Sequence, residues 1–281
     1  MLRIAVPNKG ALSQASQTML IEAGYLQRRD TRELVIADEE NNVEFFYLRP
    51  RDIAVYVGSG ILDVGITGRD LLLDSEGAAE EALALGFAKS TFRFAGPAGE
   101  FSDVRQLAGK RVATSYDKLL RQHLADAGID AGVVRLDGAI ESSIRLGVAD
   151  AIADVVETGN TMRAAGLEVF GEPIMRSEAL LIRQQDVQDT DAVDILSRRL
   201  QGVLVARQYV MMDYDIREDL LEAATAVTPG LEAPTVSALS REGWVAVRAM
   251  VPKGGTNQTM DRLYEVGARA ILVSPIAAAR L

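Results

Sequence analysis

The first 176 residues alternate short apolar runs, rich in β-branched side chains, with segments of helical periodicity, and this alternation restricts the folds open to the chain. Continuous apolar strands separated by helices are typical of parallel βαβ units in α/β proteins, whose sheets are covered on both faces. The pattern predicts strands at Leu2–Val6, Val43–Arg49, Val64–Thr67, Arg93–Gly96, Arg111–Ser115, Val133–Leu136 and Ala151–Val156. Helical patterns separate them at about 11–23, 51–59, 116–127 and 140–146.

Two segments predict that this α/β part is divided into two lobes. The Gly/Pro cluster Gly96–Gly99 predicts a crossing between two lobes, and Ser177–Arg183 is expected to return as a strand. A chain that crosses and comes back resembles the two-lobed type II periplasmic-binding-protein architecture. Its site would lie in the cleft between lobes, at the carboxyl ends of strands. We expect lobe I over residues 1–95 and 177–206, and lobe II over residues 96–176.

The order of expected elements changes from about residue 207. The segment 207–281 is expected to run strand, helix, strand, strand, helix, strand, which is the ferredoxin-like βαββαβ order. Many small domains of this order bind amino acids as regulators, although the order alone hosts many functions. The acidic stretch Gln184–Asp194, ahead of this domain, predicts a solvated loop that leads into a helix.

Composition excludes several chemistries. The chain has no cysteine and one histidine, so a thiolate nucleophile, a histidine triad and a multi-histidine metal site are ruled out. His123 has no partner within sequence reach and is predicted to be a packing or surface residue. A net charge of −10 argues against nonspecific binding of nucleic acid, and it means that phosphate ligands would need local cations. The sequence predicts neither a signal peptide nor a membrane span, and hence a cytoplasmic protein.

The segment Asp154–Thr161 runs from an apolar strand into a polar turn and has the build of a monophosphate cradle. Gly159 lets the backbone approach an oxyanion, and the N–H groups that follow would point at the same place. The acidic residues Asp154 and Glu157 suit the hydroxyl donors of a ribose. A plain connecting turn would also use Gly and Thr. The side-chain donors of the cradle are Thr158, Asn160 and Thr161.

Three strand-end turns each carry a cation: Lys9 beside Gly10, Arg49, and Arg69 beside Asp70. Together they could supply the local positive charge that phosphate ligands need in a protein with a net negative charge. Each also has a simpler interpretation, as a surface cation or, for Asp70, as a helix N-cap.

Tyr116 and Glu141 are further candidates. Tyr116 opens a helix after a strand, where it could stack on a base or pack the cleft wall. Glu141 stands on the first turn of the helix before the cradle, where it serves either a ligand or the helix dipole.

With these segments assembled, the chain closely resembles the long-form ATP phosphoribosyltransferases of histidine biosynthesis, and their actinobacterial branch in particular. The resemblance covers essentially the full length. It rests on Pro7–Gly10, Gly68–Asp70, Asp154–Thr161 and Thr228–Thr235. One departure is Ala233, which stands where a serine is often found, and which could weaken one hydrogen bond to a regulatory ligand.

The resemblance implies that ATP and phosphoribosyl pyrophosphate give phosphoribosyl-ATP and pyrophosphate, with Mg²⁺ required. It further implies inhibition by histidine, competition by AMP, and dimers that assemble into hexamers. The 5-phosphate would be held by Glu157–Thr161 and the ribose hydroxyls by Asp154. Lys9, Arg49 and Arg69 would face the pyrophosphate or triphosphate. Asp70 and Tyr116 would lie near the nucleotide, and Glu141 could help to offset the positive charge on the ribose.

For the C-terminal domain the resemblance implies a histidine site. Asp215 is the candidate for the ammonium group, and the loop with Leu231, Ala233 and Thr235 offers backbone donors and a hydroxyl. The alternative is that Asp215 caps a helix that begins near Arg217.

Three other interpretations remain open from sequence. The strongest is a non-enzymatic solute- or amino-acid-binding protein, which the two-lobed layout also fits. The others are a catalytically silent regulatory subunit and a phosphoribosyltransferase for another base. The sequence identifies no metal ligands.

Overall fold

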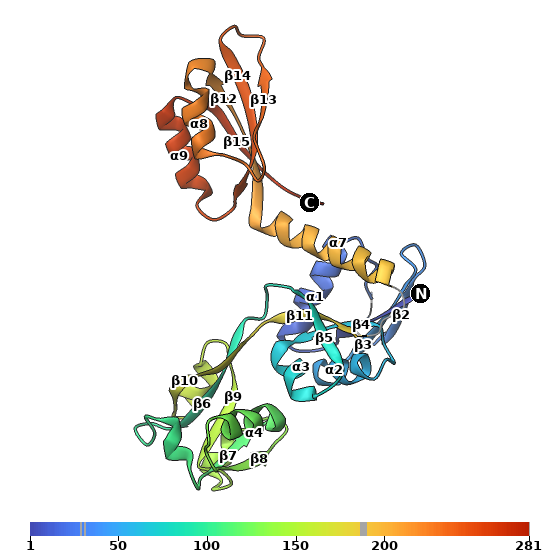
Figure 1. Cartoon of the computed structure of the whole chain (residues 1–281), viewed down its shortest axis with the longest axis vertical. Helices are drawn as coiled ribbons and strands as arrows, with labels where there is room; N and C mark the ends of the chain where they lie inside the picture. Colours follow the sequence, from blue (N-terminus) through green and yellow to red (C-terminus); the bar gives the residue numbers. More distant parts are fainter. Residues whose placement is uncertain (29, 31, 186–189, 281) are drawn as a thin grey trace. The chain divides into compact units, whose positions relative to one another are not determined.

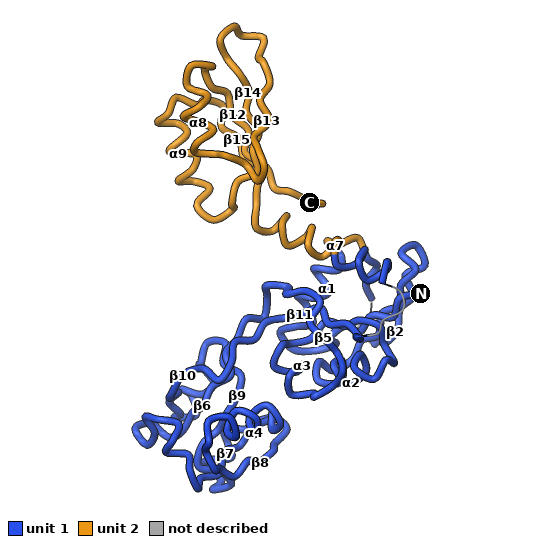
Figure 2. Tube along the Cα trace, viewed as in Figure 1, with its two compact units in different colours: residues 1–21, 25–197 blue, residues 22–24, 198–281 orange. Residues whose placement is uncertain are grey.

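The computed structural model describes residues 1–28, 30, 32–185 and 190–280, and these form two compact units (Figures 1 and 2). Unit 1 comprises residues 1–21 and 25–197, and unit 2 comprises residues 22–24 and 198–281. The predicted solvated loop within Gln184–Asp194 lies partly outside the described residues. No helix in the described part of the chain is both long and apolar enough to cross a membrane.

The first sheet of unit 1 has the strand order β2-β3-β1-β4-β11-β5. The central strand β1 runs parallel to β3 and β4, whereas β11 is antiparallel to both of its neighbours, β4 and β5. Its strands are β1 (Leu2–Pro7), β2 (Val35–Asp38), β3 (Val43–Leu48), β4 (Val64–Gly68), β5 (Ala79–Ala84) and β11 (Ala179–Gln184). The helices that follow β1, β3 and β4 are α1 (Ala11–Glu22), α2 (Pro50–Gly58) and α3 (Arg69–Ser75).

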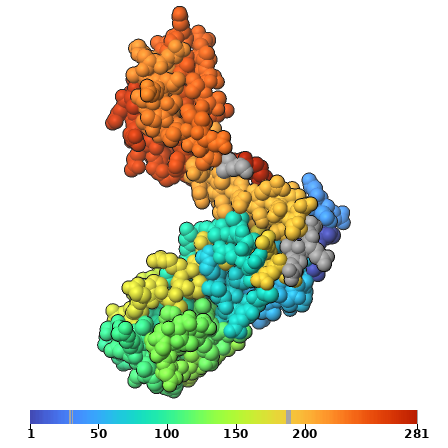
Figure 3. Space-filling model, in the orientation of Figure 1, coloured from blue at the N-terminus to red at the C-terminus, as the bar shows by residue number. Residues whose placement is uncertain are grey.

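The second sheet of unit 1 has the order β10-β6-β9-β7-β8. Its residues are largely green and yellow in the space-filling view of Figure 3. Strand β7 runs parallel to β8 and β9, whereas β6 is antiparallel to β9 and β10. The strands are β6 (Ser90–Pro97), β7 (Arg111–Thr114), β8 (Gly132–Arg135), β9 (Ala151–Val156) and β10 (Leu167–Ser177). The helical segments are η1 (Val104–Leu107), α4 (Asp117–Asp126), α5 (Ser142–Arg145) and α6 (Asn160–Ala164).

Each sheet thus receives one antiparallel strand that arrives from the other lobe: β11 beside β4, and β6 beside β9. This exchange confirms the two-lobed, type II periplasmic-binding-protein-like core. The predicted crossing at Gly96–Gly99 is wrong, because β6 already belongs to the second sheet and the chain crosses before Ser90. The Gly/Pro cluster instead ends β6, with Pro97 opposite Leu167.

The sequence pattern also missed β2, β5 and β10. Strand β5, with the sequence AEEALA, lies at the sheet edge and is built of good helix formers. In β10 the pairing register shifts between Phe170 and Met175, which interrupts the alternation.

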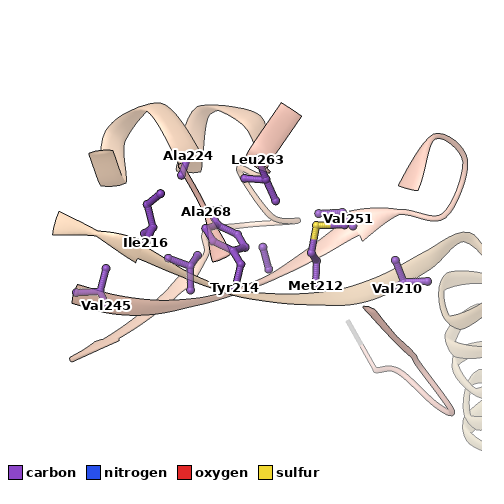
Figure 4. Packing of buried hydrophobic residues seen from close by; sticks show 11 residues of the cluster. Val210, Met212, Tyr214, Ile216, Ala224, Val245, Val251, Leu263 and Ala268 are labelled. Carbon is purple, nitrogen blue, oxygen red and sulfur yellow. The ribbon is translucent and has the colours of Figure 1, made fainter. Parts of the chain in front are cut away.

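Unit 2 contains an antiparallel sheet of order β13-β14-β12-β15. This order and the connecting helices confirm the ferredoxin-like βαββαβ domain. In Figure 4 the side chains of Met212, Tyr214 and Ile216 lie between β12 and the helices that carry Ala224 and Leu263. Helix α7 (Thr190–Gln208) begins in unit 1 and ends in unit 2. The other elements of unit 2 are β12 (Tyr209–Arg217), η2 (Glu218–Leu220), α8 (Leu221–Val227), β13 (Thr235–Ala238), β14 (Trp244–Pro252), α9 (Thr256–Val266) and β15 (Arg269–Pro275).

The packing of α2 on β4 requires a glycine, and this gives a stability prediction. A Cβ at Gly65 would lie 2.5 Å from Ile53 Cγ2 and 3.1 Å from Ala5 Cβ, in a fully buried core. We expect Gly65→Ala to lower the free energy of unfolding by about 1–3 kcal/mol, because the close-packed neighbours cannot retreat. The control is Gly132→Ala, where the nearest atom is 3.6 Å away, and its effect should stay within about 0.5 kcal/mol. Denaturant titration of both variants measures the difference, and equal effects would contradict it.

Candidate active site

A pocket of about 260 Å³ lies between the two lobes of unit 1. Lobe I contributes the turn after β1, with Lys9 and Gly10, and the start of α3, with Asp70. Lobe II contributes Tyr116, at the start of α4, and Glu157, at the end of β9. Five of the predicted site residues, from four separate segments, therefore line one pocket at the carboxyl ends of strands.

Asp70 is the buried acid of this pocket, with 6 % of its surface exposed. Ser177 Oγ donates to Asp70 Oδ1 at 2.7 Å and accepts from the Asp70 backbone N–H at 3.1 Å. Burial raises the pKa of the Tyr116 hydroxyl, and the charge of Asp70 and a hydrogen bond to it raise that pKa further. Tyr116 therefore stays protonated and donates toward Asp70. Its ring packs on Phe92 with a centroid distance of 5.4 Å.

A second pocket, of about 320 Å³, adjoins the first because Val155 and Glu157 line both. Its walls carry the acids Glu141 and Asp154 and the cradle residues Thr158, Gly159 and Thr161. Acceptors for ribose hydroxyls and donors for a phosphate thus face one space.

Asp154 has the most perturbed carboxyl group of the site. Burial raises its pKa to about 6; the hydrogen bond from Val155 N–H (2.8 Å) opposes that rise, and the charges of Glu141 and Asp70 add to it. A carboxylate of this kind is ionised at neutral pH but stands in a poorly solvated place. Perturbed groups of this kind gather at functional sites.

The cradle turn depends on Gly159, whose φ of +72° is the left-handed region that favours glycine. Arg163, one turn into α6, donates from Nη2 to the Thr158 carbonyl at 3.0 Å and to Asn160 Oδ1 at 2.5 Å. Asn160 itself is exposed and does not line the second pocket. Its side-chain amide is held by the bond from Arg163. Arg163 is not among the residues predicted from the sequence, although its spacing from Asn160 on a helix was a usable signal.

The predicted cations are distributed differently from the expectation. Lys9 lines the first pocket, whereas Arg49 and Arg69 line neither pocket. Arg49 is exposed at the N-cap of α2, and Arg69 pairs with Glu81 (2.8 Å) and Glu178 (3.4 Å). Hydrogen bonding to Glu81 is the main cause that raises the pKa of Arg69.

Two other residues are found only through the structure. Arg93 of β6 stands opposite Asp154 of β9 in the strand register, and its Nη2 donates to the Gly171 carbonyl at 2.6 Å. Ser177, which bonds Asp70, lies 107 residues from it in the chain. His123 is half-buried beside Phe94 at 5.8 Å, and burial lowers its pKa, as befits the predicted packing role.

Unit 2 carries a separate pocket of about 430 Å³ on its sheet. Asp213, Asp215, Thr235 and Arg248 line it, with Arg248 Nε 2.6 Å from Asp213 Oδ1. Asp215 lies within β12, opposite Ala246, so the alternative that it caps a helix is wrong. The predicted loop residues Leu231 and Ala233 are exposed and do not line this pocket.

The carboxylates of the site fit a magnesium ion that arrives with its phosphate ligand. Within the described residues no group of three or more His, Cys, Asp or Glu side chains is placed to hold a metal by itself. Mg²⁺ is usually bound through one or two carboxylates plus substrate phosphates and water. Asp154 and Glu157, beside the phosphate cradle, are a donor set of that kind.

Fold and site together define the class: a two-lobed α/β protein with a ligand pocket between its lobes and a C-terminal ferredoxin-like domain. The sequence profile of the family described as ATP phosphoribosyltransferase matches residues 49–202, and that of its C-terminal domain matches residues 206–278. The chain belongs to the ATP phosphoribosyltransferase family.

Several relatives extend over the whole chain. It is 72 % identical over 281 residues to the ATP phosphoribosyltransferase of Kocuria rhizophila, and 69 % identical over 286 residues to that of Paenarthrobacter aurescens. Both alignments cover all of this chain and all of the relative. Among solved structures, the ATP phosphoribosyl transferase (HisG:HisZ) complex of Thermotoga maritima matches with a TM-score of 0.63 at 26 % identity, covering 73 % of this chain and 98 % of that one.

Proposed function

We propose that the chain is the ATP phosphoribosyltransferase of histidine biosynthesis, which joins ATP and phosphoribosyl pyrophosphate to give phosphoribosyl-ATP and pyrophosphate. The observation that carries this proposal is the pair of adjoining pockets at Glu157. One offers carboxylates and a Thr/Gly turn suited to a ribose 5-phosphate, and the other offers Lys9, Asp70 and Tyr116 for the nucleotide and the leaving phosphates. A non-enzymatic binding protein is not favoured, because full-length relatives at high identity are named as this transferase.

The chemistry asks for no general base. The adenine N1 attacks with a lone pair and has no proton to lose, which is compatible with pockets lined by neither histidine nor cysteine. The demanding step is departure of pyrophosphate from the anomeric carbon, which leaves positive charge on the ribose ring. Ionised Asp154, with Glu141 nearby, would stabilise that charge, and it would act strongly because the site is poorly solvated.

The leaving pyrophosphate needs positive charge. Lys9 would bind it from the turn after β1, and Arg49 and Arg69 would reach it only after a change of side-chain conformation. Magnesium, bound with the substrate, would neutralise part of the growing negative charge. Glu157, Thr158, Gly159, Asn160 and Thr161 would fix the 5-phosphate, and Gly10, Asp70 and Tyr116 would position the adenine nucleotide.

Regulation completes the proposal. Histidine would bind in unit 2, with its ammonium at Asp215 and a hydroxyl contact from Thr235, both of which line the pocket there. Leu231 and Ala233 would contribute through the neighbouring loop. AMP would compete in the active site, and the working enzyme would be a cytoplasmic dimer that assembles to a hexamer.

Product identification tests the reaction. The protein is mixed with phosphoribosyl pyrophosphate, Mg²⁺ and each of ATP, GTP and free adenine, and the products are analysed by mass spectrometry. We expect a phosphoribosyl adduct of ATP alone, formed only when Mg²⁺ is present. Adduct formation on a free base instead would make the protein a phosphoribosyltransferase of another kind.

Asp215→Ala separates regulation from catalysis. We expect turnover to stay unchanged and inhibition by histidine to fall by at least tenfold, because a carboxylate that binds an ammonium group typically contributes about 1.5–3 kcal/mol. Initial rates over a histidine titration measure both quantities. Glu265→Ala, an exposed acid of α9 outside the pocket, is the control. Unchanged inhibition in Asp215→Ala would remove Asp215 from the histidine site.

A further inference from the structure

Asp74 lies on α3 one turn after Asp70, and its side chain is buried, with 4 % exposed. Residues four apart lie on the same face of a helix. This face of α3 is turned toward lobe II, because Asp70 bonds Ser177 of β10 and Asp74 reaches the start of α4. None of the reaction chemistry described above uses Asp74.

The Asp74 carboxylate caps α4 from the opposite lobe. Its Oδ1 accepts from the backbone N–H groups of Lys118 and Leu119, both at 3.1 Å. The residue at the N-cap position of α4, Tyr116, makes no side-chain capping bond of its own. The unpaired N–H groups of the first helical turn are thus satisfied by a residue of lobe I.

Arg51 of α2 completes the link. Its Nη1 lies 2.6 Å from Asp74 Oδ2, and its Nη2 donates to the Ser115 carbonyl at 2.6 Å. The guanidinium also stands 5.0 Å from the centre of the Tyr116 ring. A largely buried ion pair in this geometry holds α2, α3 and the start of α4 together, and loss of one partner would leave a buried charge unpaired.

The covalent connections between the lobes lie elsewhere. In the described chain the lobes are joined through residues 85–89 and through Glu178. The two connecting segments pair with each other: the Leu85 N–H donates to the Ala179 carbonyl, and the Ala179 N–H donates to the Phe87 carbonyl, each at 2.9 Å. Short connections of this kind, at the ends of strands, are the usual sites of hinge motion between lobes. Contacts at the rim of the pocket are then the ones that can fix how far apart the lobes stand.

We propose that Asp74 is a positioning residue for the transfer reaction: by capping α4 and pairing with Arg51, it holds Tyr116 against Asp70 and sets the width of the nucleotide end of the pocket. The ligand assignment in this proposal rests on the proposed function. The Asp74 contacts themselves do not.

Steady-state kinetics give the first test. We expect Asp74→Ala to raise KM for ATP about tenfold, while KM for phosphoribosyl pyrophosphate and kcat change less than threefold, because the ribose cradle lies in the other pocket. Asp74→Asn keeps the capping oxygen but loses the charge, so it should restore part of the affinity. A general loss of folding would not produce this split. Equal rises in both KM values, or no change in either, would overturn the proposal.

Asp63 supplies the matched control. It accepts the Arg3 backbone N–H at 2.7 Å and pairs with the Arg3 guanidinium at 3.0 Å, but both partners belong to lobe I. Asp63→Ala therefore removes a carboxylate that, like Asp74, accepts from a backbone N–H and pairs with an arginine, but it breaks no contact with lobe II. We expect it to leave both KM values within threefold of the parent protein, and a tenfold rise in KM for ATP there would also overturn the proposal.

A distance measurement tests the link without any turnover. The chain has no cysteine, so Ile61→Cys in lobe I and Leu146→Cys in lobe II, both exposed, can carry spin labels. We expect Asp74→Ala to broaden the inter-label distance distribution and Asp63→Ala to leave it unchanged. An unchanged distribution in Asp74→Ala would refute the link even if transfer to ATP is confirmed. A broadened distribution would support it even if the acceptor proves to be another nucleotide.

Discussion

Asp154→Asn is expected to lower turnover by on the order of 10²–10³, the usual loss when one group that stabilises transition-state charge is removed. The amide has nearly the same shape, and its oxygen can still accept the Val155 N–H. It carries no negative charge, however, to stabilise the positive ribose ring. Single-turnover rates with saturating substrates measure the loss, and an effect below tenfold would contradict the assigned role.

The same substitution should stabilise the fold, which separates a catalytic defect from misfolding. Burial raises the pKa of Asp154 to about 6 from an ordinary value of 3.8, so its ionised form is disfavoured in the native state. The native state then holds the proton more tightly than the unfolded state, and this contribution to stability is lost as pH rises from about 4 through 6. Above pH 6, the free energy of unfolding of Asp154→Asn should therefore exceed that of the parent protein by about 1–3 kcal/mol, and below pH 4 the two should be equal.

The dependence of kcat/KM on pH in the parent protein should show the titration of Asp154. We expect kcat/KM to fall as pH drops through about 6, because protonated Asp154 offers no charge to the ribose. A rate that stays level to pH 5 would exclude Asp154 as the charged group.

Lys9→Ala is the second substitution with a large expected effect, again on the order of 10²–10³ in turnover. Lys9 is the predicted cation that lines the pocket between the lobes, so the leaving pyrophosphate would lose its direct cation from this chain. Lys9→Arg should recover part of the rate, because it restores charge in a different shape.

The control for Lys9→Ala is Lys110→Ala, an exposed lysine of lobe II that lines neither pocket. Its turnover should equal that of the parent protein. Histidine binding, followed by calorimetry, should persist in both variants, because the pocket in unit 2 is untouched. Loss of histidine binding in Lys9→Ala would indicate misfolding and would remove this support for its role.

The sequence carried most of the site because the site is built from local turns. Lys9 and Asp70 follow buried strands of the first sheet, and the cradle Asp154–Thr161 follows a buried strand of the second. Turns at the carboxyl ends of strands are the usual place for a ligand cleft in such folds, so the local pattern was enough to select these residues. The ferredoxin-like domain was likewise predicted from element order, and its observed strand order confirms it.

What the sequence could not supply depends on long-range pairing. Ser177 meets Asp70 only because β10 returns beside β6, and Arg93 stands opposite Asp154 only through the β6–β9 register. The position of Arg69 was missed for a different reason: Glu81 and Glu178, which pair with it, come from an unpredicted edge strand and from the return segment.

The most direct measurement follows the absorbance change of phosphoribosyl-ATP formation, on mixing the protein with ATP, phosphoribosyl pyrophosphate and Mg²⁺, with pyrophosphatase to pull the reaction and with or without histidine. We predict a rise that histidine suppresses. A rise indifferent to histidine would keep the transferase and contradict the regulatory site in unit 2. No rise from folded protein would contradict the assignment as an ATP phosphoribosyltransferase and favour a binding protein that uses the same cleft.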